Sequence, residues 1–166
     1  MCARKLNDAE IAAGERLRIA VLHADKPAAN RVKEISSRVL QNFHPGCPVS
    51  IHWWSVESLN DKELFETSRQ AAAEADLLFL ALNTSVELSP EVKNWLPAAL
   101  AGNGSGRRRA LIVLLDTRDV PRAWHSQVER YLRNQASSAG IDYFMYLDRR
   151  SPSARGLTDV EERGLP

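Results

Sequence analysis

Polar side chains that could bind a ligand lie at the end of, or directly after, three of the most apolar stretches of this chain. The stretches cover residues 17–24, 77–82 and 110–115. Carboxylates, hydroxyls, an amide, an imidazole and an ammonium group offer hydrogen bonding and acid–base chemistry. The candidate ligand-binding residues are His23, Asp25, Lys26, Asn83, Thr84, Ser85, Asp116 and Thr117. The alternative is that they are ordinary turn and cap residues, which follow most strands.

No arrangement that would make these residues catalytic is visible. His23 and Asp25 are two positions apart and could form an acid–base pair, although a packed or capping histidine is the simpler interpretation. The four histidines have no metal-ligand spacing, and no G-x-S-x-G motif marks a serine nucleophile. We therefore predict a binding site without catalytic residues and without metal ligands.

The apolar stretches themselves predict strands. Residues 17–24, 77–82 and 110–115 are almost continuously apolar, which is typical of parallel strands buried on both faces. Residues 48–56 alternate between apolar and polar, and 141–147 are mixed, so both favour edge strands.

Helical patterns separate the expected strands. The first begins at Asp25-Lys26-Pro27, the second has Asn60 as its expected cap, and the third begins at Ser89-Pro90-Glu91. A fourth precedes Gly140. Alternating strands and helices predict an α/β fold, a three-layer α/β/α sandwich on a five-stranded parallel sheet.

The strand order follows from the burial patterns. The order 2-1-3-4-5 places the two mixed strands at the edges, and it is the order of the flavodoxin-like superfold, which this layout resembles. In that order a ligand site lies at the carboxyl ends of the first and third strands. We expect residues 17–148 to form this domain, with an N-terminal arm at 1–16 and a polar tail at 149–166.

One segment resembles the NADPH-dependent FMN reductases. Ser89-Pro90, Lys93-Asn94 and Trp95 stand in the order found after that family's third loop, which implies an FMN-dependent NAD(P)H oxidoreductase. The loop at 83–85 lacks the family's aromatic residue. The first turn, 23–29, has no Ser, Thr or Gly, its Asp25 would repel a phosphate, and only Lys26 compensates in part.

Phosphoacceptor receiver domains share this fold. Where a receiver has an acidic pair, an acceptor aspartate, a Ser/Thr and a lysine, this chain has Asp25 alone, Asn83, Thr117 and Arg149. Without a carboxylate at position 83 there is no nucleophile for phosphoryl transfer. The resemblance thus implies at most a degenerate, receiver-like signalling domain.

Composition argues against several partners. A net charge of +1 gives no general attraction to nucleic acid or membranes. No apolar run has the length of a membrane span, about 20 residues. Residues 107–109 are three arginines that we expect to be solvated. Cys2 and Cys47 lack metal-ligand spacing, so we expect free thiols in a reducing compartment and a cytoplasmic protein.

Trp53 and Trp54 are adjacent on an expected edge strand, so they must point to opposite faces of the sheet. One should be buried, and homodimerisation through this edge is one way to cover the other. The leading hypothesis is a non-catalytic module that binds a small ligand or a protein, with no cofactor. The alternatives are a divergent FMN-dependent oxidoreductase and a receiver-like domain.

Overall fold

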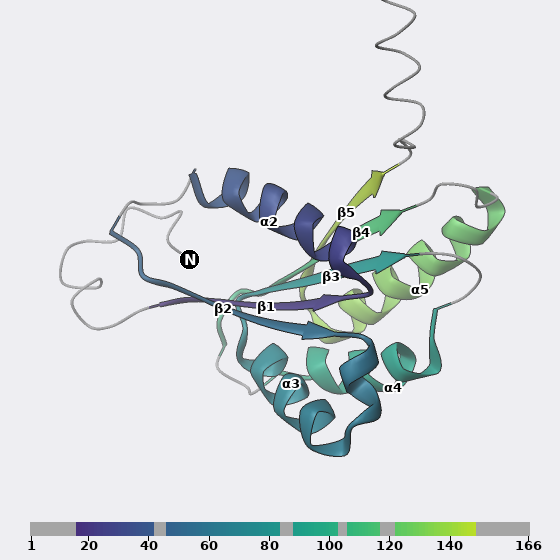
Figure 1. Ribbon diagram of the computed structural model, residues 1–166, viewed down its shortest axis with the longest axis horizontal. Coiled ribbons are helices and arrows are strands. Elements are labelled where there is room, and N and C mark those ends of the chain that lie inside the picture. Colours follow the sequence, from purple (N-terminus) through teal and green to yellow (C-terminus); the bar gives the residue numbers. More distant parts are fainter. Residues whose placement is uncertain (1–15, 42–45, 84–87, 103–105, 117–121, 149–166) are drawn as a thin grey trace, which may run out of the picture.

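Five parallel strands form one sheet in the order β2-β1-β3-β4-β5 in the computed structural model (Figure 1). It describes residues 16–41, 46–83, 88–102, 106–116 and 122–148, with the backbone alone for 122–126 and Asp148. The strands are β1 (Leu17–His23), β2 (Val49–Ser55), β3 (Leu77–Asn83), β4 (Ala110–Asp116) and β5 (Asp142–Asp148). The helices are α2 (Lys26–Gln41), α3 (Lys62–Glu74), α4 (Pro90–Leu100) and α5 (Arg122–Ala139), with the 3₁₀ helix η1 (Glu57–Asn60).

The predicted fold and strand order are confirmed. Three layers, with parallel strands in the order 2-1-3-4-5, define the flavodoxin-like architecture. Strand β3 is its centre: Leu77 to Leu82 are buried on both faces, and Asn83 is the first exposed residue. The arm at 1–15 and the tail at 149–166 lie outside the described residues.

The helices are distributed unevenly between the two faces of the sheet (Figure 1). Side chains from α3, α4 and α5 pack on one face, where they surround Leu80, Val113 and Trp95. On the other face the described residues supply one helix, α2, whose Ala28 and Val32 pack against β1, β3 and β4. Consequently α2 covers the central strands and leaves the two edge strands less protected.

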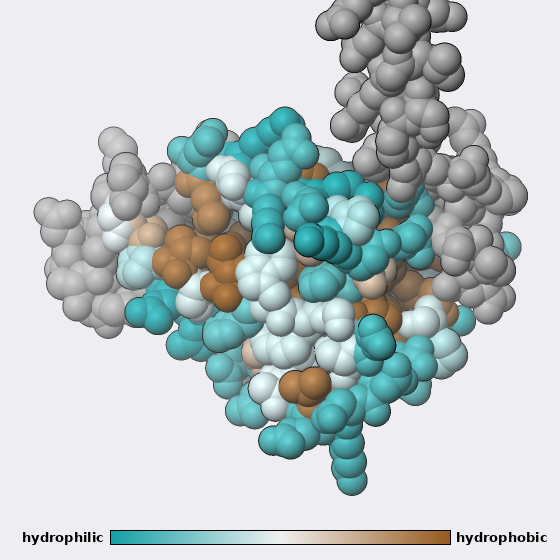
Figure 2. Space-filling view, in the orientation of Figure 1, coloured by the Kyte–Doolittle hydropathy of each residue, from teal (hydrophilic) through white to brown (hydrophobic). Residues whose placement is uncertain are grey.

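Large apolar side chains are exposed beside α2. Four of the five exposed large hydrophobic residues among the described side chains belong to the α2 side of the sheet by strand alternation. Figure 2 shows apolar side chains exposed over β2, between α2 and α3. The four are Val49 (39%), Trp53 (36%), Phe144 (52%) and Tyr146 (48%). Trp54 points the other way and is partly buried against the opposite core, as expected for adjacent strand residues.

Helix α3 begins one residue later than predicted. Its cap is Asp61, whose carboxylate accepts hydrogen bonds from the N–H groups of Glu63 and Leu64. The prediction of Asn60 as the cap is wrong because Asn60 ends the helix η1, where its side-chain amide donates to the carbonyl of Glu57. The start of α4 is confirmed, with Ser89 as its cap and Pro90 in the first turn.

Two of the three arginines before β4 hold parts of the fold together, whereas Arg108 is solvated as predicted, with 75% of its side chain exposed. Arg107 lies 3.1 Å from buried Asp76, and Arg108 lies 3.3 Å from Asp142. Arg109 donates hydrogen bonds to the carbonyls of Ala72 and Ala75 at the end of α3, and to those of Ala99 and Leu100 at the end of α4. A cation at two helix C-termini satisfies carbonyls that have no helical partner.

Cys47 is disulfide-bonded, so the prediction of a free thiol at this position is wrong. No described cysteine is free, and the other cysteine of the sequence, Cys2, lies outside the described residues. Two cysteines without a recognisable spacing do not show from the sequence whether either of them is disulfide-bonded. Free thiols therefore no longer support a reducing compartment. None of the described helices is long and apolar enough to cross a membrane.

Candidate functional site

The carboxyl ends of the central strands bring several predicted site residues to one edge of the sheet. Asn83 at the end of β3 is paired in register with Asp116 at the end of β4. His23 ends β1 beside Ala81 of β3. Each of these three residues lies two positions after a side chain that faces α2, so all three belong to the α2 side of the sheet.

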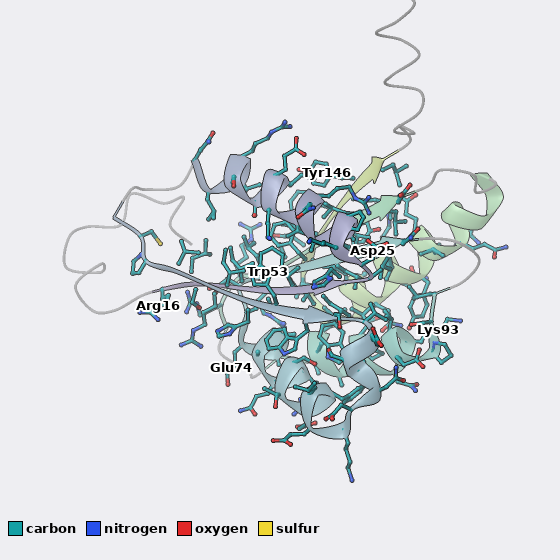
Figure 3. The ribbon with its side chains drawn as sticks, viewed as in Figure 1. Arg16, Asp25, Trp53, Glu74, Lys93 and Tyr146 are labelled. Atoms are coloured by element: carbon teal, nitrogen blue, oxygen red, sulfur yellow. The ribbon has the colours of Figure 1, made fainter. Side chains whose placement is uncertain are left out.

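Asp25 fixes the start of α2 and connects it to β3. One carboxylate oxygen accepts a 2.8 Å hydrogen bond from the N–H of Ala28, which is the geometry of a helix cap. The other oxygen accepts a 3.0 Å hydrogen bond from the side-chain amide of Asn83. The sequence placed the cap of α2 at Asp25 or Lys26, and the structure has it at Asp25, which also connects the start of α2 to the end of β3. Figure 3 shows Asp25 at this end of α2.

This arrangement places a negative charge where a phosphate would bind in the same fold. The N-terminus of a helix attracts anions through its free N–H groups and its dipole. Here the carboxylate of Asp25 occupies that position, and Pro27 removes a further N–H from the first turn. A phosphate would have to displace Asp25 and meet its charge, so the helix start does not offer the usual phosphate site.

A buried ion pair lies beside this contact. Asp116 is 4% exposed, and its Oδ2 lies 3.6 Å from Nη1 of Arg31, which projects from the second turn of α2. The Arg31 side chain is 18% exposed. Its Nε and Nη2 are buried and have no hydrogen-bond partner among the described residues. Arg31 is therefore a largely buried cation held by one long ion pair.

His23 lies against an aromatic neighbour. Its ring is 6.4 Å from the ring of Trp53, centroid to centroid, and Lys33 of α2 lies 5.7 Å from the same tryptophan. The Nδ1 of His23 is buried without a partner in the described part of the chain. Since no hydrogen bond to Asp25 is formed, the geometry favours a packed histidine over the acid–base pair.

The structure brings some of the predicted residues together, and others lie outside the part of the chain that it describes. Asp25 and Asn83 are bonded to each other, and Asp116 is their neighbour through its register with Asn83. Lys26 is exposed at the first residue of α2. The remaining predicted residues, Thr84, Ser85 and Thr117, lie outside the described residues. Within the described ranges, no group of three or more His, Cys, Asp or Glu side chains could hold a metal ion.

Arg31 lies beside the candidate site but was not among the residues predicted for it from the sequence. The available signal was its position three residues after Ala28 and one before Val32, which places a charge at the margin of the apolar stripe of α2. A charge at that margin can lie in solvent or turn toward the strand ends. The sequence alone does not distinguish these orientations.

Comparisons with known proteins give similar solved structures at low sequence identity. No protein-family model matches the sequence. No curated protein matches it significantly. The chain is similar to the solved structure of the Trp repressor binding protein from Bacillus subtilis, with 11% identity, 83% of this chain and 89% of that chain covered, and a TM-score of 0.46. It is also similar to a flavodoxin from Streptococcus pneumonia TIGR4, with 15% identity, 82% and 88% coverage, and a TM-score of 0.46.

Proposed function

We propose that this chain is a non-catalytic, small-ligand-binding module of the flavodoxin-like fold that works without flavin. The observation that carries the proposal is the position of Asp25. Its carboxylate caps α2 through Ala28 and accepts from Asn83, so its own charge stands where the phosphate of FMN would approach. The carboxyl edge nevertheless remains polar, with Arg31 and Asp116 beside this contact.

The experiment is a titration of FMN followed by flavin fluorescence, with the melting temperature as a second readout. We expect no quenching and no thermal shift up to roughly 100 µM FMN, because a dissociation constant above that concentration corresponds to a binding free energy weaker than about 5.5 kcal/mol. Purified protein should be colourless. Stoichiometric quenching by the wild-type chain would overturn the proposal and support the FMN-dependent oxidoreductase instead.

A matched pair of variants tests whether the charge of Asp25 is what excludes the phosphate of FMN. Asp25→Ser keeps a residue that can cap α2 and removes the charge, so it should bind FMN or phosphate more tightly than the wild type does. Asp61→Ser makes the same change at the cap of α3 and should leave binding unaltered. Equal behaviour of Asp25→Ser and the wild type would show that the charge of Asp25 is not what excludes the anion.

The receiver-like alternative has its own test. Asn83 stands at the end of β3 and donates its amide hydrogen to Asp25, and an amide is no phosphoacceptor. We expect incubation with acetyl phosphate and Mg²⁺ to leave the intact mass unchanged. An added phosphoryl group on any aspartate would contradict the proposal and favour a signalling domain.

A further inference from the structure

We propose that Arg31 binds the carboxylate group of a small monoanionic ligand at the carboxyl edge of the sheet. This inference rests on the proposed function and names its ligand class. It starts from the guanidinium: five N–H donors lie in one plane, and those on Nε and Nη2 form the parallel pair that matches the two oxygens of a carboxylate. In this chain that pair has no acceptor among the described residues.

Donors without an acceptor are unusual for a side chain as buried as Arg31. A guanidinium that leaves water normally gains hydrogen bonds in exchange, because unpaired buried donors are costly. The interaction of Arg31 with Asp116 is an ion pair at 3.6 Å, which is too long for a good hydrogen bond. Arg109 shows the contrast within the same chain, since its guanidinium donates to four backbone carbonyls. Arg109 is committed to the fold, whereas Arg31 keeps its donor pair available.

The position of Arg31 suits a ligand at this edge. It lies in the second turn of α2, next to Asp116 at the end of β4. Its side chain retains 18% exposure, so rotation about its outer torsions can turn the donor pair toward solvent. That movement gives up one long ion pair and no hydrogen bond to the described residues.

The neighbouring charges select the class of anion. Asp116 lies beside Arg31, and Asp25 lies nearby at the start of the same helix. Two carboxylates repel a phosphate, which carries up to two negative charges, more strongly than they repel a monoanion. A planar carboxylate with a single charge fits both the donor pair and this electrostatic setting.

The experiment uses acetate as the probe, with chloride and inorganic phosphate at equal ionic strength. Acetate should raise the melting temperature of the wild-type protein saturably, and chloride should not. Arg31→Gln should weaken the response at least about tenfold, as expected for the loss of charge-assisted hydrogen bonds. Arg38→Gln is the matched control on the same helix, because Arg38 is 73% exposed and paired with Glu34; it should respond like the wild type.

A second measurement keeps the inference testable if Arg31→Gln does not fold. In the wild-type protein, the Nε–H resonance of Arg31 should shift with acetate and stay in place with chloride. Arg31→Lys retains the charge without the paired donors and should bind acetate more weakly. An unchanged response in Arg31→Gln, a stationary Nε–H resonance, or stronger stabilisation by phosphate would overturn the inference. FMN binding would instead overturn the proposed function, so the two failures are distinguishable.

Discussion

The indole N–H of Trp95 donates a 2.9 Å hydrogen bond to the hydroxyl of Ser68, and both side chains are buried. Trp95 belongs to α4 and Ser68 to α3, so this bond joins the two helices below the sheet. The Ser68 hydroxyl in turn donates to the carbonyl of Phe65. Trp95, the largest fully buried side chain among the described residues, therefore has its one polar atom satisfied.

Ser68→Ala should destabilise the protein by about 1–3 kcal/mol, since the substitution leaves the indole N–H of Trp95 buried without an acceptor. Urea unfolding followed by tryptophan fluorescence measures this change. Ser36→Ala is the control: that serine is also buried, but among the described residues its hydroxyl donates to a carbonyl of its own helix and not to another element. Its loss should cost less than about 1 kcal/mol. Equal effects of the two substitutions would mean that the interhelical bond adds no stability.

Gly102→Ala should be more harmful than Gly140→Ala. Both glycines have a positive φ, +72° and +69°, which costs a residue with a Cβ about 1–2 kcal/mol. At Gly102 the new Cβ would also lie 2.8 Å from Nη1 of Arg109, whereas at Gly140 it would meet nothing within 4 Å. Thermal unfolding should therefore show a larger loss for Gly102→Ala, and similar losses would contradict a role for the Arg109 contact.

Tyr143 should make the fold sensitive to alkaline pH. Burial, aided by the negative charge of Glu129, raises the pKa of Tyr143 above its ordinary value of 10.0, while Arg133 opposes the shift. A raised pKa in the folded state means that the stability contribution is fully present below about pH 10 and is lost as the pH rises beyond it.

Tyr143→Phe removes the phenol that titrates. Relative to this variant, the wild type should lose stability as the pH rises above about 10, and the difference should be constant at lower pH. Urea midpoints on both sides of that pH measure the effect. Tyr146→Phe, at a half-exposed position of the same strand, is the comparison and should follow the wild type. A flat difference for Tyr143→Phe would contradict the prediction.

The exposed aromatic residues beside α2 predict self-association. Trp53 on β2 and Tyr146 on β5 lie on opposite sides of α2 in Figure 3, on the face that this helix covers only in the middle. We expect sedimentation velocity to detect a dimer at roughly tens of micromolar, a range typical of moderate association. Trp53→Ser should shift the equilibrium to monomer. Leu64→Ser removes an exposed apolar residue from α3 and should not. A wild-type monomer at that concentration would end the homodimer prediction.

The strand order was predictable because the pattern of apolar and polar residues in each strand reflects how many of its faces are buried. Leu77 to Leu82 contain no polar residue, which is tolerable only for a strand buried on both faces. Trp53 and Trp54 occur in an alternating strand, and alternation marks an edge. The cap of α2 was predictable to within one residue, Asp25 or Lys26, because capping is a local interaction between residues close in the chain.

The missed features depend on contacts between distant parts of the chain. The orientation of Arg31 follows from where α2 lies on the sheet relative to Asp116, and no local pattern contains that information. The contacts of Arg109 were equally unpredictable, because it bonds to the ends of two helices that come earlier in the sequence. The cap of α3 was misplaced by one residue. Both Asn60 and Asp61 are residue types that can cap a helix, but Asn60 belongs to the 3₁₀ helix η1, so Asp61 is the cap.

Arg109 also affects how the protein unfolds locally. The guanidinium of Arg109 donates to carbonyls in the last turns of both α3 and α4, so the opening of either helix end frees the side chain that also holds the other. The two ends should then exchange their amide hydrogens as a single cooperative unit. Helix α2, which has no such shared anchor among the described residues, can open on its own on the opposite face.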